Sequence, residues 1–210
     1  MTIAKDLKQK IKSEATKNKI LEAARNELVS KGYAGIRISN VAELAGVSKG
    51  ALTHHFENKQ SLITQVVEYA YQQGSEVSYE VIDNLKSGER VIDELVRDLK
   101  SYYLGENFKI SISLLSLEEY EPELHQEIKS ITRKYRLPIE TKWIEKLEQF
   151  GLDKTEAKSL FALTQSMLRG MPIRIFLVND QEYVDFILNK WKEIAMQTYP
   201  VLVTKKDKGA

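Results

Sequence analysis

Two of the three histidines in this 210-residue chain stand side by side, His54 and His55 in the stretch SKGALTHHFENKQSL. Successive residues on a helix point about 100° apart, so adjacent imidazoles are poorly placed to bind one metal ion together. No nucleophile, base and orienting group assemble around the pair. Metal binding and catalysis are therefore disfavoured, which leaves contact with an anionic partner or an ordinary helix surface as the open alternatives.

The third histidine, His125, lies among Glu121, Glu123 and Glu127 and forms the only other cluster with ligand chemistry. Glu121 and His125 are one helical turn apart, but a di-metal site in a helical bundle needs a second motif of this kind, which the sequence lacks. Cysteine is absent, which excludes thiolate zinc sites and cysteine nucleophiles. We therefore predict that the protein is not an enzyme and holds neither a metal nor a cofactor.

The elements that must position these side chains are helices, because apolar residues recur three and four positions apart and only 4 prolines interrupt them. A buried stripe predicts a first helix over 14–31, which Gly32 would end in the left-handed conformation. Short helices are expected over 41–45 and 49–56, followed by a long helix that starts at 59 and continues to 85. The expected N-cap residues are Ser39 or Asn40, then Ser48, then Asn58.

The segment ELAGVSKGAL joins the two short helices. A helix-turn-helix needs a small residue where its helices cross and a glycine in its turn, and Ala42 and Gly46 supply them. The second helix would then carry a short-chained, polar and mildly basic outer face, which suits the major groove of DNA, with His55 packed beside Phe56. The predicted DNA-reading residues are Ser48, Lys49, Gly50, Thr53 and His54.

Phosphate contacts are expected on both sides of this face, with plain surface roles as the alternative. Lys59 opens the long helix, whose first N–H groups and dipole favour an anion, and Arg37 and Ser39 flank the start of the preceding helix. Residues 1–62 hold eleven Lys or Arg and six Asp or Glu, a net +5, so residues 63–210 carry −4. Lysines 5, 8, 10, 12, 17 and 19 form a basic arm that would lie along the duplex or remain a solvated tail.

The remainder of the chain predicts further amphipathic helices over 88–104, 106–119, 122–150, 153–171 and 180–199. Pro122 suits a first helical turn, whereas Pro138 and Pro172 should kink or break their helices. The expected architecture is all-α with about nine helices. It comprises a basic arm and helix-turn-helix domain over 1–62, a helical domain over 63–203 and a flexible tail over 204–210.

The stretch ISNVAELAGVSKGALTHHFENKQSL resembles, without a gap, the amino-terminal signature of the TetR family of transcriptional regulators, and ILEAARNELVSKGYAGIRIS resembles the family's first helix and link. One departure is Thr53, where the family most often has an aromatic residue against the DNA backbone. Thr53 would instead hydrogen-bond a phosphate or meet a thymine methyl group.

The resemblance implies a homodimer whose carboxy-terminal domain dimerises and binds a small-molecule effector, although a DNA-binding protein without an effector is also compatible with the sequence. The expected effector pocket is lined by Tyr102, Tyr103, Phe108, Trp143, Phe161 and Met167. The expected dimer contacts are Leu160, Leu163, Met167, Phe186 and Trp191. For both sets, plain core packing is the alternative.

The expected function is that of a repressor that binds a palindromic operator on double-stranded DNA as a homodimer and is released by the effector. No segment predicts a secretion signal, and no window reaches the roughly 18 apolar residues of a membrane span. We therefore expect a cytoplasmic protein without a membrane partner.

Overall fold

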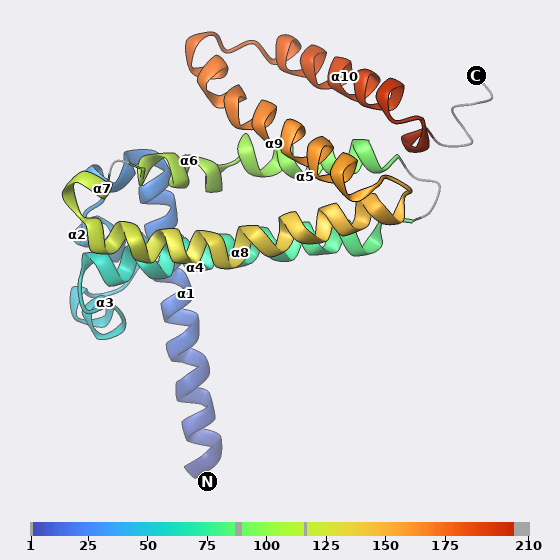
Figure 1. The fold of residues 1–210 in the computed structure, drawn as a ribbon. Coiled ribbons are helices and arrows are strands. Elements are labelled where there is room, and N and C mark those ends of the chain that lie inside the picture. The colour runs from blue at the N-terminus through green and yellow to red at the C-terminus, as the bar shows by residue number, and fades with distance from the viewer. Residues whose placement is uncertain (1, 87–89, 116, 204–210) are drawn as a thin grey trace. The chain divides into compact units, whose positions relative to one another are not determined.

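The computed structural model describes residues 2–86, 90–115 and 117–203, in which every regular element is helical (Figure 1). The predicted all-α fold is confirmed, whereas the proposed tail over 204–210 lies outside the described residues. The helices are α1 Thr2–Gly35, α2 Ile38–Leu44, α3 Lys49–His55, α4 Lys59–Asn84, α5 Val91–Tyr103, α6 Glu106–Ser113, α7 Leu117–Tyr120, α8 Pro122–Gln149, α9 Lys154–Leu177 and α10 Gln181–Thr198, followed by the 3₁₀ turn Pro200–Leu202.

The chain divides into two compact units. Unit 1 comprises Met1–Gln73 and Lys109–Arg133, and unit 2 comprises Gly74–Phe108 and Lys134–Ala210. Helices α4 and α8 each begin in unit 1 and end in unit 2, and the short α6 begins in unit 2 and ends in unit 1, so three continuous helices join the units covalently. The domain boundary that we expect at residue 62, from the shift in charge and helix length, stays a prediction.

In unit 1, α1 packs against α2 and α3 through the predicted stripe, in which Ile20, Leu21, Ala24 and Leu28 are buried. The helix begins at Thr2, well before the expected start at Glu14, because residues 2–31 contain no proline or glycine to interrupt it. Gly32 has a positive φ of 64°, as predicted, but its ψ of −179° is extended rather than left-handed helical. The chain then resumes a short helical turn to Gly35, which the sequence did not predict.

The turn between α2 and α3 is closed by backbone hydrogen bonds. Gly46, at φ 65°, donates to the Glu43 carbonyl at 3.0 Å, and Val47 donates to the Ala42 carbonyl at 3.0 Å. This pair is the Schellman arrangement that favours glycine just after a helix. Because the turn uses the last carbonyls of α2, it fixes the direction in which α3 leaves.

The predicted cap of α2 is wrong. The helix begins at Ile38, so Ser39 lies inside its first turn, and the capping position belongs to Arg37, whose side chain makes no capping hydrogen bond. Ile36 explains the earlier start, because it is buried and its N–H donates to the Gly32 carbonyl at 3.2 Å. This anchor brings the chain into the helix before Ser39 is reached.

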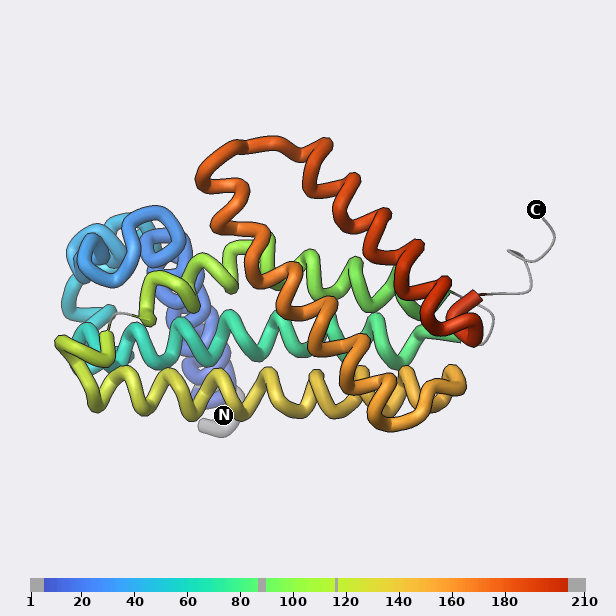
Figure 2. Tube along the Cα trace, turned by 45° about the horizontal axis from the view of Figure 1, so that its top comes forward, coloured from blue at the N-terminus to red at the C-terminus, as the bar shows by residue number. Residues whose placement is uncertain are grey.

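In unit 2, α5 contacts both α9 and α10, and α9 and α10 run antiparallel as a hairpin (Figure 2). The core between them is built from residues at helical spacing, including Leu95, Leu99, Trp143, Phe161 and Leu188. Asp153 caps α9 by accepting hydrogen bonds from the N–H groups of Thr155 and Glu156. In the described residues, no helix is both long enough and apolar enough to cross a membrane.

The expected helix breaks at Pro138 and Pro172 are absent, and a single expected helix is divided. Pro138 lies within an unbroken α8 and Pro172 within α9, which continues to Leu177. Pro138 is exposed, so water can bond the carbonyl that its missing N–H leaves free. The single helix expected over 106–119 is present as two described helices, α6 and α7.

Candidate nucleic-acid interface

Helix α3 is capped as predicted and presents a polar face. Ser48 accepts a hydrogen bond from the Ala51 N–H at 3.1 Å, while Leu52 is buried against unit 1. The five residues that we expect to read DNA are all exposed, namely Ser48, Lys49, Gly50, Thr53 and His54. A β-carbon added at Gly50 would come no closer to another atom of the chain than 3.9 Å, at the Ser48 hydroxyl. The small face is thus not required by packing inside the protein.

Thr53, His54 and His55 differ in their exposure and in their contacts within the chain. The Thr53 hydroxyl donates to the carbonyl oxygens of Lys49 and Gly50, each at 3.1 Å, so its proton is shared within α3. His55 is half-buried with its ring centroid 6.3 Å from that of Phe56, as expected. His54 is exposed, and its centroid lies 5.5 Å from that of His55. Only the first histidine of the pair stands on the open face.

Arg37 and Ser39 are both exposed at the start of α2. Lys59 instead lies against α1. Its ammonium donates to the Tyr33 carbonyl at 2.8 Å and sits 4.2 Å from the Tyr33 ring centroid. Burial lowers the pKa of Lys59, against the opposing pull of the Glu121 charge. The side chain that we expect to contact phosphate thus also joins the first turn of α4 to the end of α1.

Glu121, at the start of α8, connects three helices of unit 1. It accepts hydrogen bonds from the Tyr33 hydroxyl and, at 2.6 Å, from the Gln60 amide. These donors, Tyr33 first, hold the pKa of Glu121 below its ordinary value. One turn further along α4, the Thr64 hydroxyl donates to Glu127 at 2.9 Å. In the sequence, Glu121 and Glu127 stand beside His125, whereas their hydrogen-bond partners are 60 or more residues away and could not be predicted from spacing.

Glu121 and Glu127 are therefore occupied by hydrogen-bond donors. Across the described ranges, no three His, Cys, Asp or Glu side chains are grouped so as to hold a metal ion. The cluster around His125 serves to attach α8 to the helices of unit 1.

In unit 2, three of the residues expected to line an effector pocket lie together. The ring centroids of Tyr102 and Tyr103 are 5.0 Å apart, and that of Phe108 is 4.9 Å from that of Tyr103. Two guanidinium groups border this aromatic cluster. The Arg136 Cζ lies 3.7 Å from the Tyr102 ring centroid, and the Arg169 Nη2 lies 3.4 Å from the Tyr103 hydroxyl.

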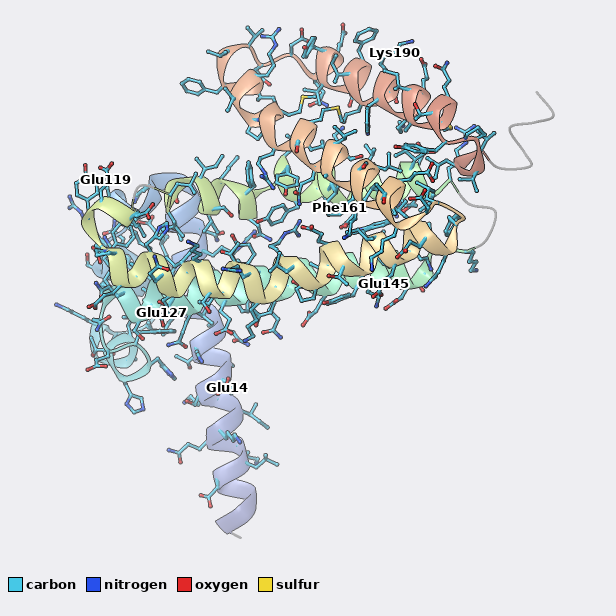
Figure 3. All side chains as sticks on the ribbon, in the orientation of Figure 1. Glu14, Glu119, Glu127, Glu145, Phe161 and Lys190 are labelled. Atoms are coloured by element: carbon cyan, nitrogen blue, oxygen red, sulfur yellow. The ribbon has the colours of Figure 1, made fainter. Side chains whose placement is uncertain are left out.

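All six of the expected pocket residues belong to one core cluster, in which Tyr103 is buried and Tyr102 and Phe108 pack against it. Trp143 and Phe161 are fully buried, and Met167 is half-buried against the same cluster. Figure 3 labels Phe161 on α9. An open groove of about 390 Å³ lies elsewhere in unit 2, between α4 and α5, and its lining includes Glu80, Glu94 and Arg97. This groove is charged and is not the apolar pocket that we expect.

Sequence reasoning missed Asp98, a buried carboxylate in unit 2. Its Oδ2 accepts from the Trp143 indole N–H at 2.7 Å and its Oδ1 from the Ser78 hydroxyl at 2.8 Å. The signal was present in the sequence, because Asp98 occupies the apolar stripe of α5 between Leu95 and Tyr102. An acid at a core position needs buried donors.

Of the expected dimer contacts, Leu163 is 55 % exposed and Phe186 is 64 % exposed. Leu160 is fully buried, and Trp191 is half-buried with its indole N–H bonded to the Thr164 hydroxyl at 2.9 Å. Leu163 belongs to an exposed seam along α9, with alternating steps of four and three residues. The α9 seam consists of Ser159, Leu163, Ser166, Gly170, Ile173 and Leu177.

These features together define a helix-turn-helix DNA-binding regulator: two short helices joined by a glycine turn, with an exposed polar face on the second. The model of the family described as "Bacterial regulatory proteins, tetR family" matches residues 20–66. The "HTH-type transcriptional regulator CymR" of Pseudomonas putida is 33 % identical over 184 residues, 88 % of this chain and 91 % of the relative. The chain belongs to the TetR family of transcriptional regulators.

Solved structures share the fold. A TetR-family regulator from Mesorhizobium loti has a TM-score of 0.66 and 17 % identity, covering 89 % of this chain and 97 % of its own. FadR from Bacillus subtilis, solved in complex with stearoyl-CoA, has a TM-score of 0.58 and 23 % identity, covering 84 % of this chain and 96 % of its own. Family membership makes this chain a DNA-binding regulator of transcription rather than an enzyme.

Proposed function

We propose that the chain is a cytoplasmic repressor that binds a palindromic operator as a homodimer and is released by a small-molecule effector. The observation that carries the DNA-reading part is the exposed face of α3, where small and basic residues surround Gly50 with no packing need for a glycine. Binding in a DNA groove would explain the glycine, because a residue without a side chain lets the backbone approach base edges and phosphates closely.

Within this face we assign separate roles. Lys49 contacts a phosphate or a guanine edge, and Ser48 and His54 flank it. Thr53 meets a thymine methyl rather than a phosphate, because its hydroxyl proton is already shared with carbonyls of α3. Arg37, Ser39 and Lys59 add phosphate contacts, and Lys59 would have to share its ammonium between the Tyr33 carbonyl and the duplex.

A homodimer is required because one helix-turn-helix reads only half a site. The α9 seam supports self-association, since its three large apolar residues are exposed and its other three residues are small. A β-carbon at Gly170 would meet no atom of the described chain within 4 Å, which leaves room for close approach by a second copy. Phe186 on α10 would add to this interface.

The aromatic cluster of Tyr102, Tyr103 and Phe108 is our candidate for effector binding. Tyr102 and Phe108 are half-buried and would supply its apolar surface over the buried Tyr103, and Arg136 and Arg169 offer charge to an anionic group on the ligand. FadR, which shares the fold, was solved in complex with stearoyl-CoA, and this supports a ligand-binding role for the chain. The ligand would weaken DNA binding if it favours a form of the dimer in which the two α3 helices are wrongly spaced for the operator. Helices α4 and α8, which continue from one unit into the other, would transmit this change.

The test is a selection of bound fragments from random duplexes. A palindrome with half-sites about one duplex turn apart is expected, and Lys49→Ala should relax or weaken the selected sequence. Lys129→Ala, an exposed lysine on α8, serves as the matched control and should leave the selection unchanged. Recovery of no preferred sequence by a folded protein would reject the proposal.

The effector part needs its own measurement. A thermal-shift panel of apolar, cationic and anionic compounds should yield ligands that raise the melting temperature and weaken operator binding. Tyr102→Ala should lower the affinity for such a ligand without changing operator affinity in its absence. A ligand that stabilises the protein but leaves operator affinity unchanged would reject the coupling.

A further inference from the structure

The amino-terminal part of α1 extends beyond the rest of unit 1 as an isolated helix. Residues 6–15, 18 and 19 are exposed, and Figure 3 shows Glu14 on this rod with no second helix packed against it. The rod is continuous with the part of α1 that packs against α2 and α3. Its orientation relative to the recognition helix α3 is therefore set by the core of unit 1.

The net charge of this arm lies on one face. Residues 6–19 hold five lysines and two acids, a net +3. At about 100° per residue, Lys8, Lys12 and Lys19 fall within about 40° of one another, and no acid shares their face. Asp6, Lys10, Glu14 and Lys17 gather within about 80° on the opposite face, where the charges cancel.

The lysine row is also free to act. Lys8, Lys12 and Lys19 are exposed, and within the described ranges none of them forms an ion pair with an acid. Lys8 and Lys19 are eleven positions apart in the sequence, which corresponds to about 16 Å along the helix axis. A duplex carries one negative charge for every ~1.7 Å of its axis, so a row of this length meets several phosphates.

We propose that this row binds the phosphate backbone of duplex DNA beside the groove occupied by α3, as a contact independent of base sequence. It rests on the proposed DNA binding but extends it to a second surface of the chain. An isolated helix of this length is only marginally stable in water, and the duplex would hold it in place. Leu7 and Ile11, 58 % and 60 % exposed, form a separate edge of the rod that this contact does not use.

The experiment compares two pairs of substitutions that remove equal charge. K8Q/K12Q removes two lysines of the row, and K10Q/K17Q removes two from the opposite face. Glutamine keeps a similar helix propensity, so circular dichroism should be unchanged. Affinity is measured against salt concentration on the selected operator and on an unrelated duplex of equal length.

K8Q/K12Q should reduce the slope of log affinity against log salt by about 0.9 for each lost contact, about 1.8 per bound protomer, on both duplexes. K10Q/K17Q should leave the slope near that of the wild type. Equal slopes for both variants would overturn the assigned face, whether both fall or neither does. A reduced slope on the operator alone would also overturn it, because backbone contacts do not depend on sequence.

Failure of the proposed operator function would be visible separately, as a wild-type protein with equal affinity for the two duplexes. The arm could still be assessed on the unrelated duplex in that case. L7Q/I11Q completes the set. A change in its salt slope, or in its sedimentation mass, would mean that the apolar edge carries the contact instead and would overturn the lysine row.

Discussion

Two exposed helix faces, one in each unit, differ in almost every respect except exposure. The α3 face in unit 1 is polar and basic, with Lys49 and His54 around Gly50. The α9 seam in unit 2 is uncharged, with Leu163, Ile173 and Leu177 beside three small residues. Both contain a glycine whose added β-carbon would clash with no atom of the described residues.

This contrast shows that exposure alone does not identify a partner, whereas the chemistry of the exposed face does. Burying an apolar seam is favourable against a similar apolar surface, which a second copy supplies. Burying lysine ammonium groups is favourable against phosphates. The two faces therefore predict different partners, and substitutions should affect them separately.

The largest expected effect is loss of the dimer. Leu163→Glu or Phe186→Glu should yield a monomer by sedimentation, because a symmetric interface would bury two like charges. Operator affinity should fall about 10²–10⁴-fold as the second reading head is lost. Leu115→Glu, at a site 67 % exposed in unit 1, should change neither property. A Leu163→Glu protein that stays dimeric would remove the α9 seam from the comparison.

The interior of unit 2 should respond in stability alone. Trp143→Phe leaves the Oδ2 of buried Asp98 without its donor and should lower the free energy of unfolding by about 1–3 kcal/mol in urea. Trp191→Phe is the matched control, since it removes an indole bond to a neutral hydroxyl at a half-buried site, and should cost less. Equal losses of unfolding free energy in the two variants would show that the charge of the Asp98 carboxylate does not strengthen the Trp143 hydrogen bond.

Gly50→Ala should separate folding from DNA binding. The added methyl group has room in the free protein and should raise the free energy of unfolding by up to about 1 kcal/mol, because alanine favours helices. Operator affinity should fall about tenfold, the size of one base contact. Gly170→Ala, which changes the α9 seam, should leave the DNA contacts of each α3 helix unchanged. Unchanged operator affinity in Gly50→Ala would show that the α3 face does not approach DNA closely.

The smallest effect concerns Glu121 and pH. Its pKa lies below the ordinary 4.5, so the charged form contributes stability above that value and loses it as the pH falls through the lower folded pKa. Glu121→Gln should therefore be less stable than the wild type at neutral pH, by less than about 1 kcal/mol at this partly exposed site. The difference should shrink in acid.

The two units were also unequally readable from sequence. In unit 1, the stripe from Ile20 to Leu28, the Ser48 cap and the turn glycine were all predicted, because each depends on residues within one helical turn. In unit 2, the expected pocket stays a prediction, because Tyr103, Trp143 and Phe161 all belong to one buried core. Spacing shows that a residue faces inward, but not whether it meets a cavity or another side chain.

The sequence by itself determined the all-α class, the helix-turn-helix and its polar face, since helical periodicity and glycine conformations are local properties. Tertiary structure decided which inward residues are core, that Glu121 binds Tyr33 and Gln60, and that Asp98 has buried donors. It also decided that α2 begins before Ser39, because burial of Ile36 outweighed a local cap. Partners distant in the chain meet only when the whole fold has buried its apolar surface, and no short stretch of sequence specifies that arrangement.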